Sequence, residues 1–314
     1  MLAIRARILS KLQKLFLAAS SSFVERLQRR IAFIARAEHL NHSALQSTVQ
    51  GTSNERYCDA EIVVSLTTFG RRLYEVYLAI ESIMQQTLKP NRIVLWLSDD
   101  LKNDNIPLVL QNQQKRGLEI KYCKDIRAYT KLIPALKAFP SAAIITIDDD
   151  QLYHFDLIEN LVNAYKRNPK LIHCAAICHL KILGNNKIRK HKKRYGKDDL
   201  SDISPLNFPL GVGGVLYPPN CFSEEVFNEA VFMDICKYAD DVWFKAMSLL
   251  NGTMAQKVFT HDIRGRDRLQ NDSAQFITLN QVNKKNNMVS IQLNSVFKKY
   301  DLYNRLHEEA KHQS

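Results

Sequence analysis

The sequence predicts an α/β protein with a mostly parallel central sheet flanked by helices, preceded by a basic helical extension. From residue 61 onward, short apolar and β-branched runs alternate with helical patterns. Before residue 50, basic side chains surround an apolar stripe with helical spacing. Strand–helix–strand units of this length form parallel sheets covered on both faces. Ligands of such sheets bind at the carboxyl ends of the strands, so we look for chemistry there.

The apolar pattern places the elements in order. A continuous apolar run is typical of a strand buried on both faces, and an apolar residue at every third or fourth position is typical of a helix. The predicted strands are 62–66, 93–97, 118–123 and 142–147. The predicted helices carry Leu73, Val76, Tyr77, Ile80 and Met84, then Leu132, Leu136 and Phe139, then Phe155–Arg167, and one that opens at Val242.

The first 54 residues form a predicted extension to a single larger domain. Residues 1–50 read as basic amphipathic helices, and the polar stretch 42–54 reads as a linker. Such helices either lie on an anionic membrane, pack on their own domain, or form a partly disordered arm. The predicted domain then covers residues 55–314, with a nucleotide-binding half at about 55–150 and an acceptor half with C-terminal helices at about 151–314.

Charge is unevenly distributed along the 314 residues, whose formal net charge is +12. Residues 1–50 hold 8 basic and 2 acidic side chains, residues 181–197 hold 8 basic and no acidic ones, and the rest hold 28 and 30. The run 181–197 predicts a mobile basic loop that closes over a diphosphate, grips a phosphorylated acceptor, touches a membrane or has no role. Only Tyr195 interleaves it, so nucleic acid is not an expected partner. Composition excludes global disorder, and no apolar run reaches the length of a membrane span.

Cysteine content favours a reducing cytoplasm, because six cysteines are too few for a disulfide scaffold. The start lacks an uninterrupted apolar segment, which argues against a secretory signal. We expect a cytoplasmic protein, with peripheral contact at the cytoplasmic face of an inner membrane as an option. One dense cluster reads either as a metal knuckle or as half-buried strand residues. Its members are His173, Cys174, Cys178 and His179.

Three aspartates follow directly on the fourth predicted strand. Because side chains alternate along extended backbone, Asp148 and Asp150 are expected to project to the same side. Two converging carboxylates repel unless a cation lies between them, and Mg²⁺ or Mn²⁺ prefers such oxygen ligands. The alternative is a solvated acidic turn that caps the next helix.

The chain resembles family 2-type glycosyltransferases with the GT-A fold, a Rossmann-like arrangement, of the kind that builds bacterial surface polysaccharide and lipopolysaccharide. The resemblance runs from about residue 61 to 258, and more weakly to about 300. It is carried by the order and spacing of several short motifs. These are IVVSLTTF (62–69), IVLWLSDD (93–100), KLIPAL (131–136), ITIDDD (145–150), LGVGGVLYPP (210–219) and ADDVWFKAMSLL (239–250).

The resemblance implies roles for residues at matching positions. Asp148 and Asp150 match the DXD motif, which binds the metal, Mn²⁺ or Mg²⁺, and the diphosphate of the sugar donor. Asp241 matches the catalytic base, and Asp240 is its helper or a helix cap. His261 is a candidate third metal ligand or a structural histidine. The implied contacts to the nucleotide sugar are Ser65, Leu66, Thr67, Asp99, Asp100, Lys131, Asp148, Asp149, Gly213 and Gly214.

Two of these assignments have alternatives in the residues themselves. The family more often has Asp-Asp-Gly-Ser where this chain has Ser98 to Leu101, so Asp99 and Asp100 also read as an ordinary turn. The glycines of 211–214 either let backbone approach a sugar closely or form a plain surface loop. Arg264, Arg266 and Arg268 are further candidates for phosphate contact.

The resemblance implies an inverting, metal-dependent enzyme that moves a sugar from a nucleoside-diphosphate sugar to a glycan or lipid-linked acceptor. Processive relatives carry membrane spans and a Gln-x-x-Arg-Trp motif, whereas the only tryptophans here are Trp96 and Trp243. We therefore expect non-processive transfer, with membrane contact through residues 1–36 and 181–197. The alternatives are a basic polyanion- or membrane-binding protein without catalysis, and a sugar-nucleotide pyrophosphorylase.

Overall fold

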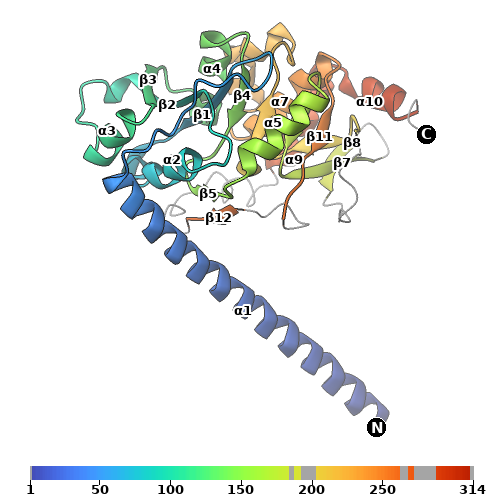
Figure 1. The fold of residues 1–314 in the computed structure, drawn as a ribbon. Coiled ribbons are helices and arrows are strands. Elements are labelled where there is room, and N and C mark those ends of the chain that lie inside the picture. The colour runs from blue at the N-terminus through green and yellow to red at the C-terminus, as the bar shows by residue number, and fades with distance from the viewer. Residues whose placement is uncertain (1, 184–186, 192–202, 262–267, 272–287, 312–314) are drawn as a thin grey trace.

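The computed structural model describes residues 2–183, 187–191, 203–261, 268–271 and 288–311 (Figure 1). Within these ranges, the side chains of residues 2–22, 191 and 307–311 are not described.

The predicted fold class is confirmed: a seven-stranded, mostly parallel sheet lies between helices, with a helix in front of it. The strand order is β11-β6-β10-β4-β1-β2-β3, and β10 alone runs antiparallel to its sheet neighbours. The four predicted strands are all present. The sheet comprises β1 (Ile62–Thr67), β2 (Arg92–Ser98), β3 (Leu118–Cys123), β4 (Ala143–Thr146), β6 (Ile172–Cys174), β10 (Val215–Tyr217) and β11 (Ala255–Lys257).

Alternating side chains of the sheet feed two hydrophobic cores, one on each face. Val63 of β1 packs into one core and Val64 into the other, and both are fully buried. The core that contains Val64 lies against α2 (Val76–Met84), α3 (Leu108–Gln114) and α5 (Leu157–Arg167). The core that contains Val63 includes residues of α4 (Ile133–Ala138), α6 (Glu229–Ile235), α7 (Asp240–Leu250), α9 (Met288–Lys299) and α10 (Leu302–Lys311). The unbroken apolar runs of the central strands are explained by this double coverage.

Two smaller sheets stand beside the main one. β5 (Gln151–Tyr153) pairs with β12 (Arg268–Gln270), and β7 (Ile177–Leu183) lies between β8 (Lys187–His191) and β9 (Asn207–Pro209). The prediction of a loop over 181–197 is therefore wrong for its described part. Residues 181–183 and 187–191 form an antiparallel hairpin in which Ile182 pairs with Ile188, and Ile188 is buried. The remaining residues of that run lie outside the described part of the chain.

The N-terminal extension is one helix, α1 (Leu2–Gln46), rather than several. Figure 1 shows its N-terminal part extending away from the sheet, while its C-terminal end packs near α2 and α3. The predicted linker begins later than expected, because Leu40 and Ala44 are buried and the helix continues through Gln46. No helix among the described residues combines the length and the apolar character that a membrane span needs.

A buried ion pair joins α2 to the end of α3. The two terminal guanidinium nitrogens of Arg116, Nη1 and Nη2, donate to the Glu81 carboxylate at 2.8 and 3.0 Å. The Glu81 side chain is fully buried. The Arg116 Nε donates to the carbonyl of Val49, which fixes the chain that follows α1. This bidentate pair therefore holds three segments together.

Replacing Glu81 should destabilise the fold strongly, because Glu81→Ala leaves the Arg116 charge buried without its partner. We expect a loss of about 3–5 kcal/mol in the free energy of unfolding, measured by urea denaturation. The matched control is Glu61→Ala, since the Glu61–Arg92 pair is 41% exposed on both sides and should contribute about 0–1 kcal/mol. Similar losses in the two variants would contradict a structural role for the buried pair.

Candidate active site

The three aspartates after β4 each contact a basic side chain. Asp148 Oδ1 lies 2.9 Å from the Lys131 Nζ, and Asp149 Oδ1 lies 2.7 Å from the Arg72 Nη1. Arg72 also reaches Asp150, with Nη2 3.5 Å from Oδ2. Asp149 and Asp150 are buried, and the cap position of α5 is taken by Asp156. The alternative of a solvated turn that caps the next helix is therefore wrong.

Lys131 joins this acidic cluster to the start of α7. Its Nζ lies 2.9 Å from Asp148 Oδ1 and 3.0 Å from Asp240 Oδ2, and its side chain is buried. Burial by itself would lower the pKa of Lys131, but the charges of Asp148, Asp240 and Asp241 raise that pKa well above its usual value. Lys131 is therefore a charged ammonium held between two acidic segments that lie far apart in the sequence.

The backbone of Lys131 is held in place from β1 and β2. The Ser65 hydroxyl donates to the Lys131 carbonyl at 2.6 Å, and the Trp96 indole N–H donates to that hydroxyl at 3.0 Å. Thr67, two residues after Ser65 on β1, donates a hydrogen bond from its hydroxyl to the Trp96 carbonyl at 2.9 Å. The polar side chains at the end of β1 thus position the site, and contact of Ser65, Leu66 and Thr67 with a nucleoside stays a prediction.

Asp240 and Asp241 open α7, and neither acts as its N-cap. That position belongs to Ala239, which makes no side-chain bond to the helix. Asp240 instead contacts Lys131, and Asp241 Oδ1 accepts a hydrogen bond of 3.1 Å from the Gly211 N–H. The expectation that Asp240 caps the helix is therefore wrong. Its role as a helper of the base stays a prediction.

The Asp241 carboxyl has a raised pKa. Burial and then the charge of Asp240 raise the pKa of Asp241 to about 6, although Lys131 acts to lower it. A carboxyl with this pKa is ionised at neutral pH and accepts a proton more readily than an ordinary aspartate.

The glycine segment 211–214 approaches the site through Gly211. A Cβ on Gly211 would lie 2.9 Å from Asp241 Oδ1 and 3.1 Å from Lys131 Nζ, so a side chain there would press on both groups. Gly213 packs against Ala176, and Gly214 has a φ of +91° and lies against Leu157. Gly211 therefore lies directly beside Asp241 and Lys131. The contact of Gly213 and Gly214 with a sugar stays a prediction.

Asp99 and Asp100 lie at the same edge of the sheet, just past β2. Both are exposed, and the Asp100 N–H donates to the Ser98 hydroxyl at 3.4 Å in a short 3₁₀ turn. The structure therefore contains the Ser-Asp turn that the residues suggested. A role for these two carboxylates toward the nucleotide stays a prediction.

Two residues of the site were missed by sequence reasoning. Arg72, in the turn after β1, is marked only by its place at the carboxyl edge of the sheet. Tyr153 is buried, and its phenolic oxygen accepts a hydrogen bond of 2.8 Å from the Asp148 N–H. No feature of the sequence marks Tyr153, because the contact depends on the turn between β4 and β5.

A second titratable cluster lies at the turn between β5 and α5. His154 Nδ1 lies 2.5 Å from Asp156 Oδ1, and His261 Nε2 lies 2.6 Å from Asp156 Oδ2. Among the His, Cys, Asp and Glu side chains of the described residues, these three form a cluster whose ligand atoms are close enough to share an ion. Neither Asp148 nor Asp150 is part of it, so the prediction that His261 is their third ligand stays a prediction.

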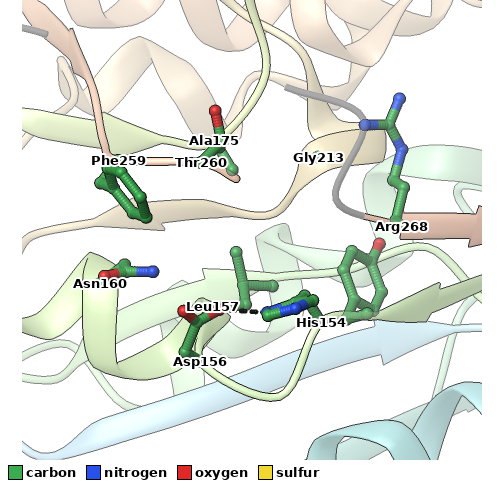
Figure 2. Close-up of a pocket in the computed structure, with 10 residues that line it drawn as sticks. His154, Asp156, Leu157, Asn160, Ala175, Gly213, Phe259, Thr260 and Arg268 are labelled. Atoms are coloured by element: carbon green, nitrogen blue, oxygen red, sulfur yellow. Dashed lines mark hydrogen bonds and ion pairs between the residues drawn. The ribbon is translucent and has the colours of Figure 1, made fainter. Parts of the chain in front are cut away.

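A pocket lies at the second cluster, and His154 and Asp156 form part of its lining. Figure 2 shows His154, Asp156 and Asn160 on one side, and Arg268 with Gly213 on the other. Tyr153 also lines the pocket and contacts the backbone of Asp148. The guanidinium of Arg268 has its pKa lowered by burial, and the charges of Asp148 and Asp150 act on it in the opposite direction. Arg264 and Arg266 lie outside the described residues.

The second reading of the cluster at 173–179 is confirmed in that its members are strand residues, but they are buried rather than half-buried. Its residues belong to β6 and β7 or lie between them, and all four are buried. His173 Nε2 contacts the Asn168 carbonyl at 2.9 Å, and burial lowers the pKa of His173 to about 4. These residues are part of the core around the sheet.

Part of the chain is similar to a known protein family. Residues 66–214 match the family model described as "Glycosyl transferase family 2". No curated protein matches the chain. Among solved structures, S. aureus TarS 1-349 in complex with UDP is similar, with 12% sequence identity and a TM-score of 0.40 over 64% of this chain. The chain spans 58% of the length of that TarS fragment.

Proposed function

Residues 66–214 carry a family 2 glycosyltransferase domain, and from that premise we propose how this glycosyltransferase works. It transfers a sugar from a nucleoside-diphosphate sugar to a glycan or lipid-linked acceptor, with inversion and one sugar at a time. Its setting is bacterial surface polysaccharide synthesis, including lipopolysaccharide. The alternatives of a pyrophosphorylase and of a polyanion-binding protein without catalysis lose support, because the family match covers the acidic cluster at 148–150.

One observation carries the proposal: Lys131 holds Asp148 and the start of α7 within a single ion-pair network. Glycosyl transfer needs a cationic environment for the leaving diphosphate and a base for the incoming hydroxyl. Asp148 belongs to the segment assigned to the diphosphate, and Asp241 to the segment assigned to the base. Their closeness lets both act on one anomeric carbon.

We assign the metal to Asp148 and Asp150. The residues fit a divalent cation, because burial and the charge of Asp148 raise the pKa of Asp150, which indicates that the two carboxylates repel each other. Carboxylate oxygens are the ligands that Mg²⁺ and Mn²⁺ prefer. When bound, the ion neutralises charge on the leaving diphosphate. Arg72 and Lys131 hold the carboxylates in position, and Asp149 is fixed by Arg72 and by the Thr68 hydroxyl at 2.7 Å.

Asp241 is proposed as the base. As the acceptor oxygen bonds to the anomeric carbon, the bond from that carbon to the diphosphate oxygen breaks, and the hydroxyl proton passes to Asp241. Attack from the face opposite the leaving group inverts the configuration. The Gly211 N–H holds Oδ1 of Asp241, and the Lys131 contact with Asp240 limits repulsion between the paired aspartates.

Removing either carboxylate should abolish transfer while the fold persists. We expect Asp150→Ala and Asp241→Asn to lower the turnover rate by about 10²–10⁴-fold or more, the usual contribution of a general base. Release of nucleoside diphosphate from a panel of sugar nucleotides measures this, with Mn²⁺ and with EDTA. The control is Asp234→Asn, an exposed aspartate of α6. Full activity of either site variant, or of the wild type in EDTA, would overturn the corresponding assignment.

The pH dependence should report the Asp241 carboxyl. Because the base must be deprotonated and its pKa is about 6, kcat/KM should fall as the pH drops below about 6 and level off above it. Lys131→Met removes a positive charge that lowers the pKa of Asp241, so the acid limb should move to higher pH. Lys137→Met, at an exposed position of α4, is the control. An unchanged limb in Lys131→Met would be evidence against Asp241 as the titrating base.

We also propose that residues 1–36 and 181–197 contact an anionic membrane. Phe23, Leu27, Ile31 and Ile34 follow helical spacing on α1, and each is 47–60% exposed. Arg26 and Arg30 lie between them in the sequence and are also exposed. An apolar stripe with flanking cations is typical of helices that lie in a bilayer interface. Exposed Lys181, Lys187 and Arg189 add positive charge on the β7–β8 hairpin.

Vesicle sedimentation tests the membrane contact. The full chain should bind vesicles with anionic lipid more tightly than neutral vesicles, and added salt should weaken binding. Phe23→Ser with Ile31→Ser should reduce binding, without loss of stability since both side chains are exposed. Leu108→Ser is the control, because Leu108 is an exposed apolar residue of α3. Equal binding by the two variants would count against the α1 surface.

A further inference from the structure

We propose that His154, Asp156 and His261 form a binding site for a divalent transition metal such as Zn²⁺, separate from the Mg²⁺ or Mn²⁺ site assigned to Asp148 and Asp150. The three ligands come from two places in the chain. His154 and Asp156 flank Phe155 in the turn between β5 and α5, and His261 follows β11. The fold, rather than local sequence, brings them together.

The potential metal-ligand atoms of the three residues lie close together. Nδ1 of His154 and Nε2 of His261 each contact a different oxygen of Asp156, at 2.5 and 2.6 Å. The two imidazole rings have centroids 4.2 Å apart. One ligand atom from each of the three residues lies within 4.8 Å of the others. Ligand atoms around a tetrahedral zinc ion are roughly 3.3 Å apart, given bonds of about 2.0–2.1 Å, so small side-chain rotations admit the ion.

Asp156 does not have the role that its position predicts. It stands at the N-cap of α5, where an aspartate usually accepts a hydrogen bond from the first turn of the helix. Its side chain makes no such bond. Both carboxylate oxygens face the two histidines instead. Burial alone would raise the pKa of Asp156, but hydrogen bonds from His261 and His154 lower it.

The donor set selects the class of metal. Two imidazole nitrogens and one carboxylate are a common zinc ligand set and also suit other transition metals. Magnesium and calcium prefer oxygen ligands throughout, so the site should discriminate against them. The acidic cluster at 148–150 has the opposite preference. The two clusters are therefore expected to bind different ions.

The site is open to the pocket. The side chains of His154 and His261 are 30% and 47% exposed, whereas that of Asp156 is 17% exposed. Figure 2 shows His154 and Asp156 at the pocket wall, across from Arg268. Three protein ligands leave a coordination position for water or for an oxygen of a bound molecule. A bound ion would also tie the segment after β11 to the β5–α5 turn, at the edge of the proposed active site.

Cobalt binding to the full-length, demetallated protein tests the proposal. Co²⁺ has visible absorption that reports tetrahedral or five-coordinate ligation, and competition with Zn²⁺ then yields the affinity. We expect the band in the wild type and in the double variant Asp148→Asn with Asp150→Asn. We expect the band to disappear, and zinc affinity to fall at least tenfold, in His154→Ala and in His261→Ala. The matched control is His39→Ala, an exposed histidine of α1.

The outcomes separate this site from the proposed catalytic metal. Absence of the cobalt band in the wild type, or its survival in both histidine variants, would overturn the zinc site. Loss of the band in the Asp148 and Asp150 double variant would show that His261 serves the acidic cluster, and it would equally overturn the proposal. Circular dichroism should confirm that both histidine variants remain folded, since His154 and His261 are partly exposed. Glycosyl transfer is not the readout, so failure here leaves the proposed function untouched.

Discussion

The buried ammonium of Lys131 is the contact on which the site depends. A buried lysine is costly unless acidic partners surround it, and Asp148 and Asp240 supply them at 2.9 and 3.0 Å. Without the lysine, the buried carboxylate of Asp240 would lose its cationic partner. The ion pairs of Lys131 with Asp148 and Asp240 therefore hold the end of β4 next to the start of α7. The hydrogen bonds from Trp96 to Ser65 and from Ser65 to the Lys131 backbone connect this network to the centre of the sheet.

The sheet explains why such a network forms at this edge. Its central strands are buried on both faces, so polar side chains are concentrated where the strands end. At that edge the acidic segment 148–150 contacts two cations, Arg72 and Lys131, which offset part of its negative charge. Burial, and then the charge of Asp240, raises the pKa of Asp241 to about 6, and the Asp241 carboxylate accepts a hydrogen bond from the Gly211 N–H. Burial also raises the pKa of Asp149 to about 6, although Arg72 acts to lower it. Asp149 and Asp241 are therefore both more basic than an ordinary aspartate.

Local sequence patterns predicted much of the fold and part of the site. The apolar and β-branched runs predicted β1 to β4 within about a residue. The pattern failed where pairing depends on distant segments. Residues 181–191 read as a basic loop, yet Ile182 and Ile188 pair across a hairpin. The end of α1 read as linker, yet Leu40 and Ala44 are buried against the domain. A high content of basic residues concealed the first contact, and a composition rich in Ser, Thr, Asn and Gln concealed the second.

Local residue patterns specify the strand and helix order, the acidic segment after β4, and the aspartate pair that opens α7. These features follow from periodicity and from short motifs, which neighbouring residues define. Which groups meet is set by the packing of distant segments. This packing pairs Arg72 with Asp149 and brings the Tyr153 hydroxyl to the Asp148 N–H. It also brings the Gly211 N–H to the Asp241 carboxylate. It also joined His261 to Asp156 across 105 residues of sequence. Such contacts depend on how helices and loops pack around the sheet, and no local pattern encodes that packing.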